Sequence, residues 1–382
     1  MRIKLALLLL VFGVIYSTNV SAFNLFDNFS LNGGTVIYFQ GANPSITSQL
    51  PSPQKGFGEV LDLALNYEGK YFNFYSRFHN GNGQGADKLF ADYLFANLNT
   101  LADDNTDDNY DLKLLEAYLS FNFFNDNLNI ILGKTEPFLF IDQNEFANDE
   151  ITQFIGKPFV NNIFFDVEDR YSPILGFAYT SGSFEFSGFL QSIENHKVFF
   201  DGKEWVMEET GVHHYDENLA SGFQVNYKAD FHGLKGNYRF FIYNNTVPHF
   251  RCYDDLSDPD RKPSLIRASG FGLSFDQYVS EKIGVFFRYG KSYHNVHHYD
   301  NFYSFGFSID CLMFENDSIL IGFSKINGNE KGFKDENHFE MQYRFFLNEN
   351  MLAAFDYQYV ENLIDFPKAD LTAITVRLTL SF

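Results

Sequence analysis

The chain has 382 residues and a formal net charge of −21, and its 48 Phe and 23 Tyr help to bring the aromatic content to 19%. So acidic a chain is a poor nucleic-acid binder, because phosphate recognition depends on basic residues. Two cysteines exclude the disulfide framework of small secreted domains. After the first 22 residues, no apolar run reaches the length of a membrane helix.

The first 22 residues have the pattern of a secretory signal peptide. Arg2 and Lys4 supply a positive region, residues 5–15 are apolar, and a small-residue cleavage site ends at Ala22. The apolar run is too short to span a bilayer as an anchor. The sequence therefore predicts an exported protein with one mature domain, residues 23–382. Loss of Arg2 and Lys4 would take its formal charge from −21 to −23.

Sixteen segments then alternate apolar and polar residues with the period of a β-strand. In chain order they are residues 31–39, 56–67, 70–79, 111–123, 128–134, 173–179, 184–191, 221–228, 235–244, 269–278, 283–291, 303–312, 317–326, 338–346, 351–359 and 371–382. A soluble sheet also alternates, but the recurrence and the terminal Phe382 are typical of outer-membrane barrels. An even count is what a single-chain bacterial barrel requires. An additional hairpin at 197–200 and 204–208 would raise it to eighteen.

The connections between these segments fall into two kinds. Short turns are predicted at 68–69, 125–127, 180–183, 280–282, 315–316 and 347–350, and long connections at 40–55, 80–110, 135–172, 192–220 and 245–268. Short turns that alternate with long loops match the periplasmic and extracellular ends of a barrel. The sequence thus predicts an all-β fold, a transmembrane antiparallel β-barrel in a Gram-negative outer membrane.

The alternation also assigns the two faces of each strand. Outward candidates are Phe72, Phe74, Phe78, Phe240, Ile242, Phe305, Phe307, Ile319, Ile321, Phe323, Phe339, Met341 and Tyr343. Inward candidates are Asn73, Arg77, Asn237, Arg239, Gly306, Ser308, Asp310, Glu340, Gln342 and Arg344. Charges on a lipid face cost about 2–4 kcal/mol at the bilayer midplane, so they belong in the lumen. A polar lumen in a barrel of this size is wide enough to hold water.

Three motifs follow one another in the middle of the first half. Leu-Glu-Ala-Tyr-Leu occupies 115–119, the segment 129–134 ends in Gly-Lys, and 140–154 reads FIDQNEFANDEITQF. Together they resemble the carbohydrate-selective porins of Gram-negative outer membranes. The resemblance is specific over residues 115–179 and elsewhere extends only to the architecture. It implies a passive channel through which sugars and other small solutes diffuse.

The strand count places the third motif in the connection between the fifth and sixth strands, which in general porins folds into the barrel. The resemblance therefore implies that this connection narrows the channel. The candidates for lining the constriction are Asp142, Asn144, Asn148, Asp149, Glu150 and Gln153, with Glu116 and the inward Arg77, Arg239, Arg288, Arg344 and Arg377 opposite them. Carboxylates and guanidinium groups bind sugar hydroxyls by charge-assisted hydrogen bonds.

A structural role is the alternative for the same residues. Asn148, Asp149 and Glu150 have the composition of a helix cap. The arginines could instead balance the lumen carboxylates, which are Asp62, Glu116, Asp276, Asp310 and Asp356.

Other functions were weighed on the loops and on the histidines. Acidic clusters at 103–108 and 254–260 would enrich cations at the channel mouth, so a general, weakly cation-preferring porin is an alternative. Long loops also suit a surface adhesin or receptor on a barrel scaffold. No nucleophile–base arrangement stands out, so an enzyme is not expected. The histidines at 213–214 and 294–298 lack a ligand frame, so neither a metal nor another cofactor is expected.

The partners that follow are of three kinds. They are outer-membrane lipid and lipopolysaccharide, small hydrophilic solutes such as sugars, and the barrel-assembly machinery, which would recognise the strand that ends at Phe382. Nucleic acid is not among them. Monomer and oligomer both stay open, because no feature of the sequence identifies a face between subunits.

Overall fold

The computed structural model describes residues 23–26, 28–45, 53–83, 85, 90, 93–101, 112–165, 170–213, 218–252, 254–293, 296–328, 334–363 and 366–382. The predicted leader, the acidic cluster 103–108, His214 and His294 lie outside these residues. No helix in the described part of the chain is long and apolar enough to cross a membrane.

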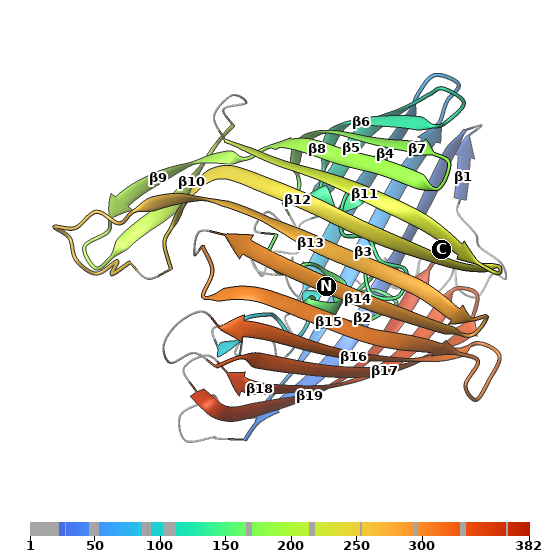
Figure 1. Cartoon of the computed structure of the whole chain (residues 1–382). Coiled ribbons are helices and arrows are strands. Elements are labelled where there is room, and N and C mark those ends of the chain that lie inside the picture. Colours follow the sequence, from blue (N-terminus) through green and yellow to red (C-terminus); the bar gives the residue numbers. More distant parts are fainter. Residues whose placement is uncertain are drawn as a thin grey trace, which may run out of the picture.

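Sixteen antiparallel strands form one closed ring (Figure 1). They are β2 (Phe29–Pro44), β3 (Gln54–Glu68), β4 (Asn73–Asn82), β5 (Lys113–Phe123), β6 (Leu128–Thr135), β7 (Ser172–Ser181), β8 (Phe184–Ser192), β11 (Leu219–Phe231), β12 (Leu234–Phe250), β13 (Leu265–Ser280), β14 (Ile283–Tyr293), β15 (Tyr299–Asp310), β16 (Asp317–Gly328), β17 (Glu336–Asn348), β18 (Met351–Leu363) and β19 (Phe366–Ser381). Each strand pairs with the next, and β19 pairs with β2 to close the barrel. A short strand, β1 (Phe23–Phe26), also pairs with β2.

The predicted fold class is confirmed, and each of the sixteen predicted segments coincides with one strand of the barrel. The alternative of eighteen strands in the barrel is wrong, although the additional hairpin on which it rested is present. The extra hairpin exists as β9 (Glu194–Phe200) and β10 (Trp205–His213), but it forms a separate two-stranded sheet. Strands β8 and β11, which precede and follow the hairpin in the chain, pair directly with each other. The hairpin therefore projects beyond the ring at one end (Figure 1).

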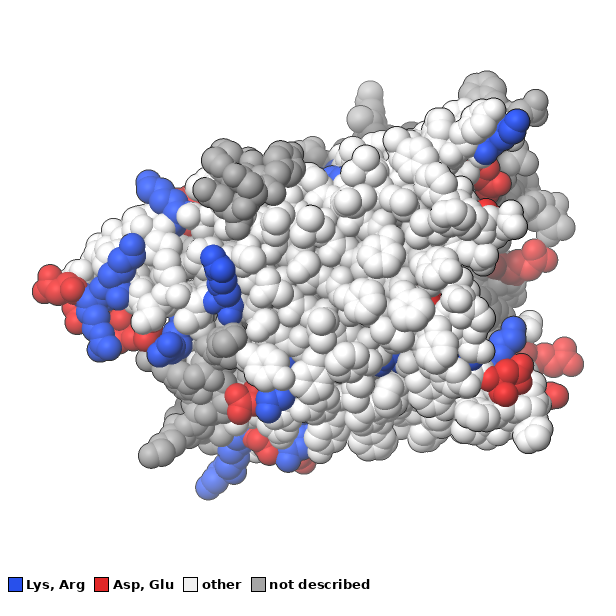
Figure 2. Space-filling model, turned by 45° about the horizontal axis from the view of Figure 1, so that its top comes forward, with Lys and Arg blue, Asp and Glu red and all other residues white. Residues whose placement is uncertain are grey.

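Successive side chains of a strand point to opposite sides of the wall, as the alternation predicts. In β12, Phe240 and Ile242 are 47% and 49% exposed, whereas Phe241 between them is fully buried. Of the other predicted outward residues, Phe72, Phe305, Phe323 and Met341 are among the exposed large apolar side chains. Figure 2 shows a broad zone almost free of charged residues, with Lys, Arg, Asp and Glu gathered at the two ends. Such a zone matches the apolar band of a membrane barrel.

The described parts of two long connections lie inside the ring (Figure 1). Residues 136–171 join β6 to β7 and contain a 3-10 turn, η4 (Pro137–Leu139), and one helical turn, α2 (Lys157–Val160). The predicted inward connection between the fifth and sixth strands is therefore present. The second inward connection joins β4 to β5 and is described at residues 83, 85, 90 and 93–101; its inward course was not predicted. Its side chains Phe90, Leu94 and Leu98 are buried against the inner wall.

Candidate functional site in the lumen

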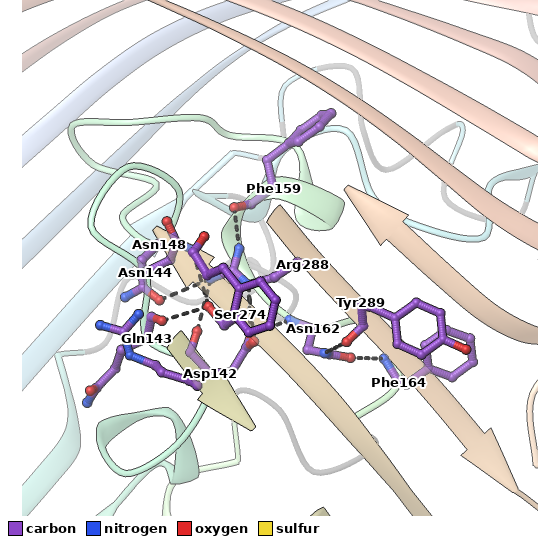
Figure 3. Close-up of polar contacts among 12 residues, drawn as sticks. Asp142, Gln143, Asn144, Asn148, Phe159, Asn162, Phe164, Ser274, Arg288 and Tyr289 are labelled. Atoms are coloured by element: carbon purple, nitrogen blue, oxygen red, sulfur yellow. Dashed lines mark hydrogen bonds and ion pairs between the residues drawn. The ribbon is translucent and has the colours of Figure 1, made fainter. Parts of the chain in front are cut away.

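The connection 136–171 is fixed to the wall by an ion pair at Asp142. The Asp142 carboxylate and the Arg288 guanidinium of β14 are both fully buried, with 3.1 Å between Nε and Oδ2 (Figure 3). Arg288 also donates to the carbonyl oxygens of Asp142 and Phe159 at 3.0 and 2.7 Å. The Asn162 N–H donates to the carboxylate at 2.7 Å. A charge buried this deeply is tolerated only when it is paired and hydrogen-bonded. The ion pair therefore fixes two parts of the connection to β14: the segment at Asp142 and the segment 159–162.

The charge state of Asp142 follows from the same contacts. Burial raises the pKa of its carboxyl to about 6, while the Arg288 guanidinium and the Asn162 N–H lower it. The ion pair with Arg288 favours the ionised carboxylate. The backbone at Asp142 is left-handed, with φ of 61°, a conformation that Asp adopts more readily than most residues. The Asp142 N–H donates to Gln224 Oε1 at 2.9 Å, which brings β11 into the same network.

Aromatic side chains of the connection fill notches in the wall, and glycines make those notches. A Cβ on Gly176 of β7 would overlap the Phe140 ring, and a Cβ on Gly284 of β14 would overlap the Phe146 ring. Phe140 and Phe146 are nearly fully buried in these positions, and Phe159 is nearly fully buried next to Gly322 of β16. Close packing of this kind fixes the connection without polar groups.

The turn at 149–152 lies against the last strands of the barrel. Arg377 of β19 donates to the carbonyl oxygens of Glu150 and Gln153, and Arg344 of β17 donates to the Thr152 carbonyl at 2.6 Å. Asp149 caps the turn, because its carboxylate accepts from the Ile151 N–H and the Thr152 hydroxyl. The capping interpretation therefore describes Asp149 correctly, although it closes a turn and not a helix.

The two inward connections meet at Glu340 of β17. Its buried carboxylate accepts from the Ile155 and Gly156 N–H groups at 2.8 and 2.9 Å. The Ile155 carbonyl in turn accepts from Thr100, which belongs to the connection 83–112. The two connections thus form one layer across the lumen.

One cavity of about 310 Å³ lies between this layer and strands β4 and β5. Arg77 and Glu116 face each other across these strands, with 2.8 Å between Nε and Oε1. The Arg77 guanidinium also donates to the Tyr171 hydroxyl at 2.7 Å. Next to them, the rings of Tyr75 and Tyr118 lie 5.1 Å apart. The remaining lining comes mainly from the two connections: Thr100, Glu136, Phe138, Leu139, Gln143, Asn148, Glu150 and Asn161.

A second cavity, of about 440 Å³, adjoins the first on the side of the short turns. Tyr75 and Arg77 belong to the lining of both cavities. The second cavity reaches Glu349 in the β17–β18 turn and Phe382 at the chain end. Tyr75 and Arg77 therefore stand where the two spaces meet.

The twelve predicted constriction residues separate into two groups by their exposure to these cavities. Four line the first cavity: Arg77, Glu116, Asn148 and Glu150. The other eight make contacts within the connection 136–171 or belong to the inner side of the wall: Asp142, Asn144, Asp149, Gln153, Arg239, Arg288, Arg344 and Arg377. Side chains in the second group, such as the fully buried Arg288, do not reach the cavity. Of the five predicted arginines, Arg77 is the one that lines this cavity.

Charge balance, the alternative for the arginines, accounts for three of them. Arg239 pairs with Asp276, Arg377 with Asp356, and Arg77 with Glu116. Alternation put these residues on the inward face but could not name their partners. The sequence reasoning also missed Tyr75, Tyr118, Tyr171, Glu136 and Gln143 as lining residues. Tyr118 lies in the first family-like motif, which is the one signal that could have pointed to it.

No three His, Cys, Asp or Glu side chains of the described residues are placed to share a metal ion. What the described residues show instead is a closed ring of sixteen antiparallel strands with a connection folded inside.

Comparisons with solved structures show the same fold. The high-pH structure of Pseudomonas putida OprB superposes with a TM-score of 0.74 at 12% identity, covering 93% of this chain and 94% of that one. The anion-selective porin from Comamonas acidovorans gives 0.56 at 10% identity, with 93% and 99% covered. An engineered variant of the Rh. blastica porin gives 0.52 at 8% identity, with 93% and 100% covered. At these identities the chain shares the porin fold, and the similarity carries no further than the fold.

Sequence comparisons add little. No protein-family model matches the chain. An uncharacterized protein of Aquifex aeolicus (strain VF5) is 24% identical over 287 residues, which cover 74% of this chain and 76% of that protein. The resemblance to carbohydrate-selective porins remains a prediction.

Proposed function

We propose that this chain is a Gram-negative outer-membrane porin through which small hydrophilic solutes, carbohydrates above all, diffuse passively. The observation that carries the proposal is the layer of two inward connections, which leaves a polar cavity at the Arg77–Glu116 pair. The band of uncharged outer surface supports a place in a membrane (Figure 2). The porin fold of the structural neighbours supports a channel.

The chemistry of the cavity supports a sugar as the solute. Arg77 and Glu116 offer donors and acceptors for charge-assisted hydrogen bonds to hydroxyl groups. The neighbouring rings of Tyr75 and Tyr118 offer apolar faces to the C–H groups of a sugar ring. A site of this size, about 310 Å³, is at the lower end of the range for small-molecule pockets.

The test is single-channel conductance of the refolded protein in a planar bilayer, with neutral sugars titrated against the current. Discrete steps that a sugar blocks support the full proposal, and steps without block reduce it to a general porin. Absence of steps from protein that shows a heat-dependent gel shift, and is therefore folded, would refute the channel.

A paired variant tests the site itself. Arg77→Gln/Glu116→Gln removes both charges at once and is expected to weaken sugar block about tenfold to a hundredfold, the range for hydrogen bonds to charged groups. Lys228→Gln/Glu185→Gln is the matched control, because that pair, at 2.7 Å, lies at the short-turn end of β8 and β11, away from the cavity. Equal block in the two variants would remove the cavity from the proposal.

A surface-interaction role is the second candidate, and the β9–β10 hairpin favours it. The hairpin projects beyond the barrel and is braced by the β12–β13 connection, where Trp205 donates to the carbonyl oxygens of Leu256 and Asp258 at 2.8 and 2.9 Å. Loops held on a rigid scaffold often carry recognition. Cell-surface binding that disappears with the hairpin, from a barrel that does not conduct, would favour this role over the channel.

A further inference from the structure

We propose that the second cavity is a second sugar subsite, so that the lumen binds a disaccharide more tightly than a monosaccharide. This inference rests on the proposed function. It deepens it by naming the length of the preferred solute and the residues that set this length, Asp62, Ala64 and Thr379.

The first step is that the two cavities share a border. Tyr75 and Arg77 of β4 line both of them. On the side of the connection 136–171, Glu150 lines the first cavity, while the next two residues, Ile151 and Thr152, line the second. A solute longer than one sugar ring can therefore extend from the first cavity into the second, between β4 and the turn at 149–152.

The second step is that both sides of this border are held in place. Arg77 is paired with Glu116, with 2.8 Å between Nε and Oε1. On the other side, the Thr379 hydroxyl of β19 donates to the Ile151 carbonyl at 3.2 Å. Groups that are ordered before the solute arrives bind it at a lower entropic cost. A solute that spans the border thus meets a site that is already formed.

The third step is that small side chains leave room for a second ring. Ala64 of β3 lies opposite Arg77 in the pairing of β3 with β4, and Gly34 of β2 lies opposite Asp62 in the pairing of β2 with β3. All four line the second cavity, whose volume of about 440 Å³ exceeds the 310 Å³ of the first. If the first cavity holds one sugar ring, the second has space for another.

The fourth step is that the lining of the second cavity suits hydroxyl groups. The Asp62 carboxylate lies 3.0 Å from His79 Nδ1, and a carboxylate has about four acceptor positions, so it can also accept from a sugar hydroxyl. Thr379 and Ser381 add hydroxyl groups, and the Tyr75 ring adds an apolar face. Carboxylate, hydroxyl and aromatic groups are also what the first cavity offers. Two net hydrogen bonds to a second ring are worth on the order of tenfold in affinity.

The experiment measures, on the same channel, the concentrations of glucose, maltose, cellobiose and maltotriose that halve the current. In the wild type, the more effective of the two disaccharides is expected to do so at a concentration about tenfold lower than glucose, because its second ring gains about two net hydrogen bonds. Maltotriose is expected to improve little on maltose, since its third ring lies beyond the two cavities.

Two variants and a control assign the effect to the second cavity. Ala64→Leu fills this cavity next to Arg77 and is expected to bring the ratio between the glucose and disaccharide concentrations towards one. Asp62→Asn removes the charged acceptor at nearly constant volume and is expected to lower the ratio severalfold, which keeps the test decisive if Ala64→Leu does not fold. Ala353→Leu, the same substitution on the outward side of β18, lies outside both cavities and is expected to keep the wild-type ratio.

The outcomes separate the inference from the function beneath it. Equal block by glucose and both disaccharides, or a ratio that Ala64→Leu and Asp62→Asn both keep, would overturn the second subsite and leave a porin with one sugar site. A further gain of the same size for maltotriose would overturn the length of two rings. Conductance steps that no sugar blocks would refute carbohydrate as the solute, and absence of steps from folded protein would refute the channel. The inference falls with either.

Discussion

Replacing Arg288 by Met is the sharpest test of how the layer is held. The substitution keeps much of the side-chain length but removes the partner of the fully buried Asp142 carboxylate. It also removes the donors to the carbonyl oxygens of Asp142 and Phe159, 3.0 and 2.7 Å away. Breaking a buried ion pair from one side costs about 3–5 kcal/mol. The docked state of residues 136–171 should therefore lose at least about a hundredfold in its equilibrium with detached states.

Amide hydrogen exchange of the folded protein, read by mass spectrometry, measures this directly. Exchange across 140–165 is expected to accelerate by about a hundredfold or more in Arg288→Met, because the Asn162 N–H and its neighbours lose their fixed acceptors. The strands should keep their protection, since the ladder of β14 is unchanged. Lys228→Met is the matched control. It breaks an exposed pair worth at most about 1 kcal/mol and should leave 140–165 as in the wild type.

The double variant Arg288→Met/Asp142→Leu completes the test. Removing both charges leaves no unpaired ion in the interior, and such replacements are often neutral in stability. Protection of 140–165 is expected to return towards the wild type. If Arg288→Met exchanges like the wild type, or the double variant like Arg288→Met, the ion pair is not what fixes the layer and the reasoning fails.

Three further outcomes are expected. Gly176→Ala should destabilise the protein by about 1–3 kcal/mol in urea, because the added methyl overlaps the Phe140 ring, whereas Gly41→Ala, which has room, should stay within about 0.5 kcal/mol; equal effects would contradict the packing argument. Glu340→Gln should raise current noise and exchange at 155–156, since an amide cannot accept both N–H groups as the carboxylate does; quiet channels would count against it. Replacing 195–210 by a short Gly-Ser turn should leave the unfolding temperature unchanged, because β9 and β10 form their own sheet; a clear drop would mean that the hairpin supports the barrel.

The sequence predicted the wall well because the wall is periodic. A single strand shows why: in β19, Ile374 and Val376 are exposed, while Thr375 and Arg377, which alternate with them, are buried. Short turns then fix where each strand ends, so that pairing and face follow from local pattern alone. The membrane side of the wall has no other requirement than to be apolar.

The lumen was predicted less well because its contacts join residues far apart in the chain. Asp142 and Arg288 are 146 positions apart, and alternation gives the face of Arg288 without its partner. The inward fold of 83–112 did leave a trace in the sequence. Phe90, Leu94 and Leu98 are apolar residues at intervals of four, and apolar side chains need a surface to cover them.

The contacts of the layer also impose an order on assembly. Residues 136–171 follow the fifth strand of the ring, yet they bind Glu340 of β17 and Arg377 of β19. The neighbouring connection binds Gln358 of β18 through the Leu98 carbonyl. These acceptor and donor sites lie on the last three strands of the chain, and β19 is also the strand that closes the ring against β2. The connection made early in the chain therefore gains its full set of contacts only when the last strands stand in the wall. A change that displaces these last strands would thus loosen the layer as well as open the ring.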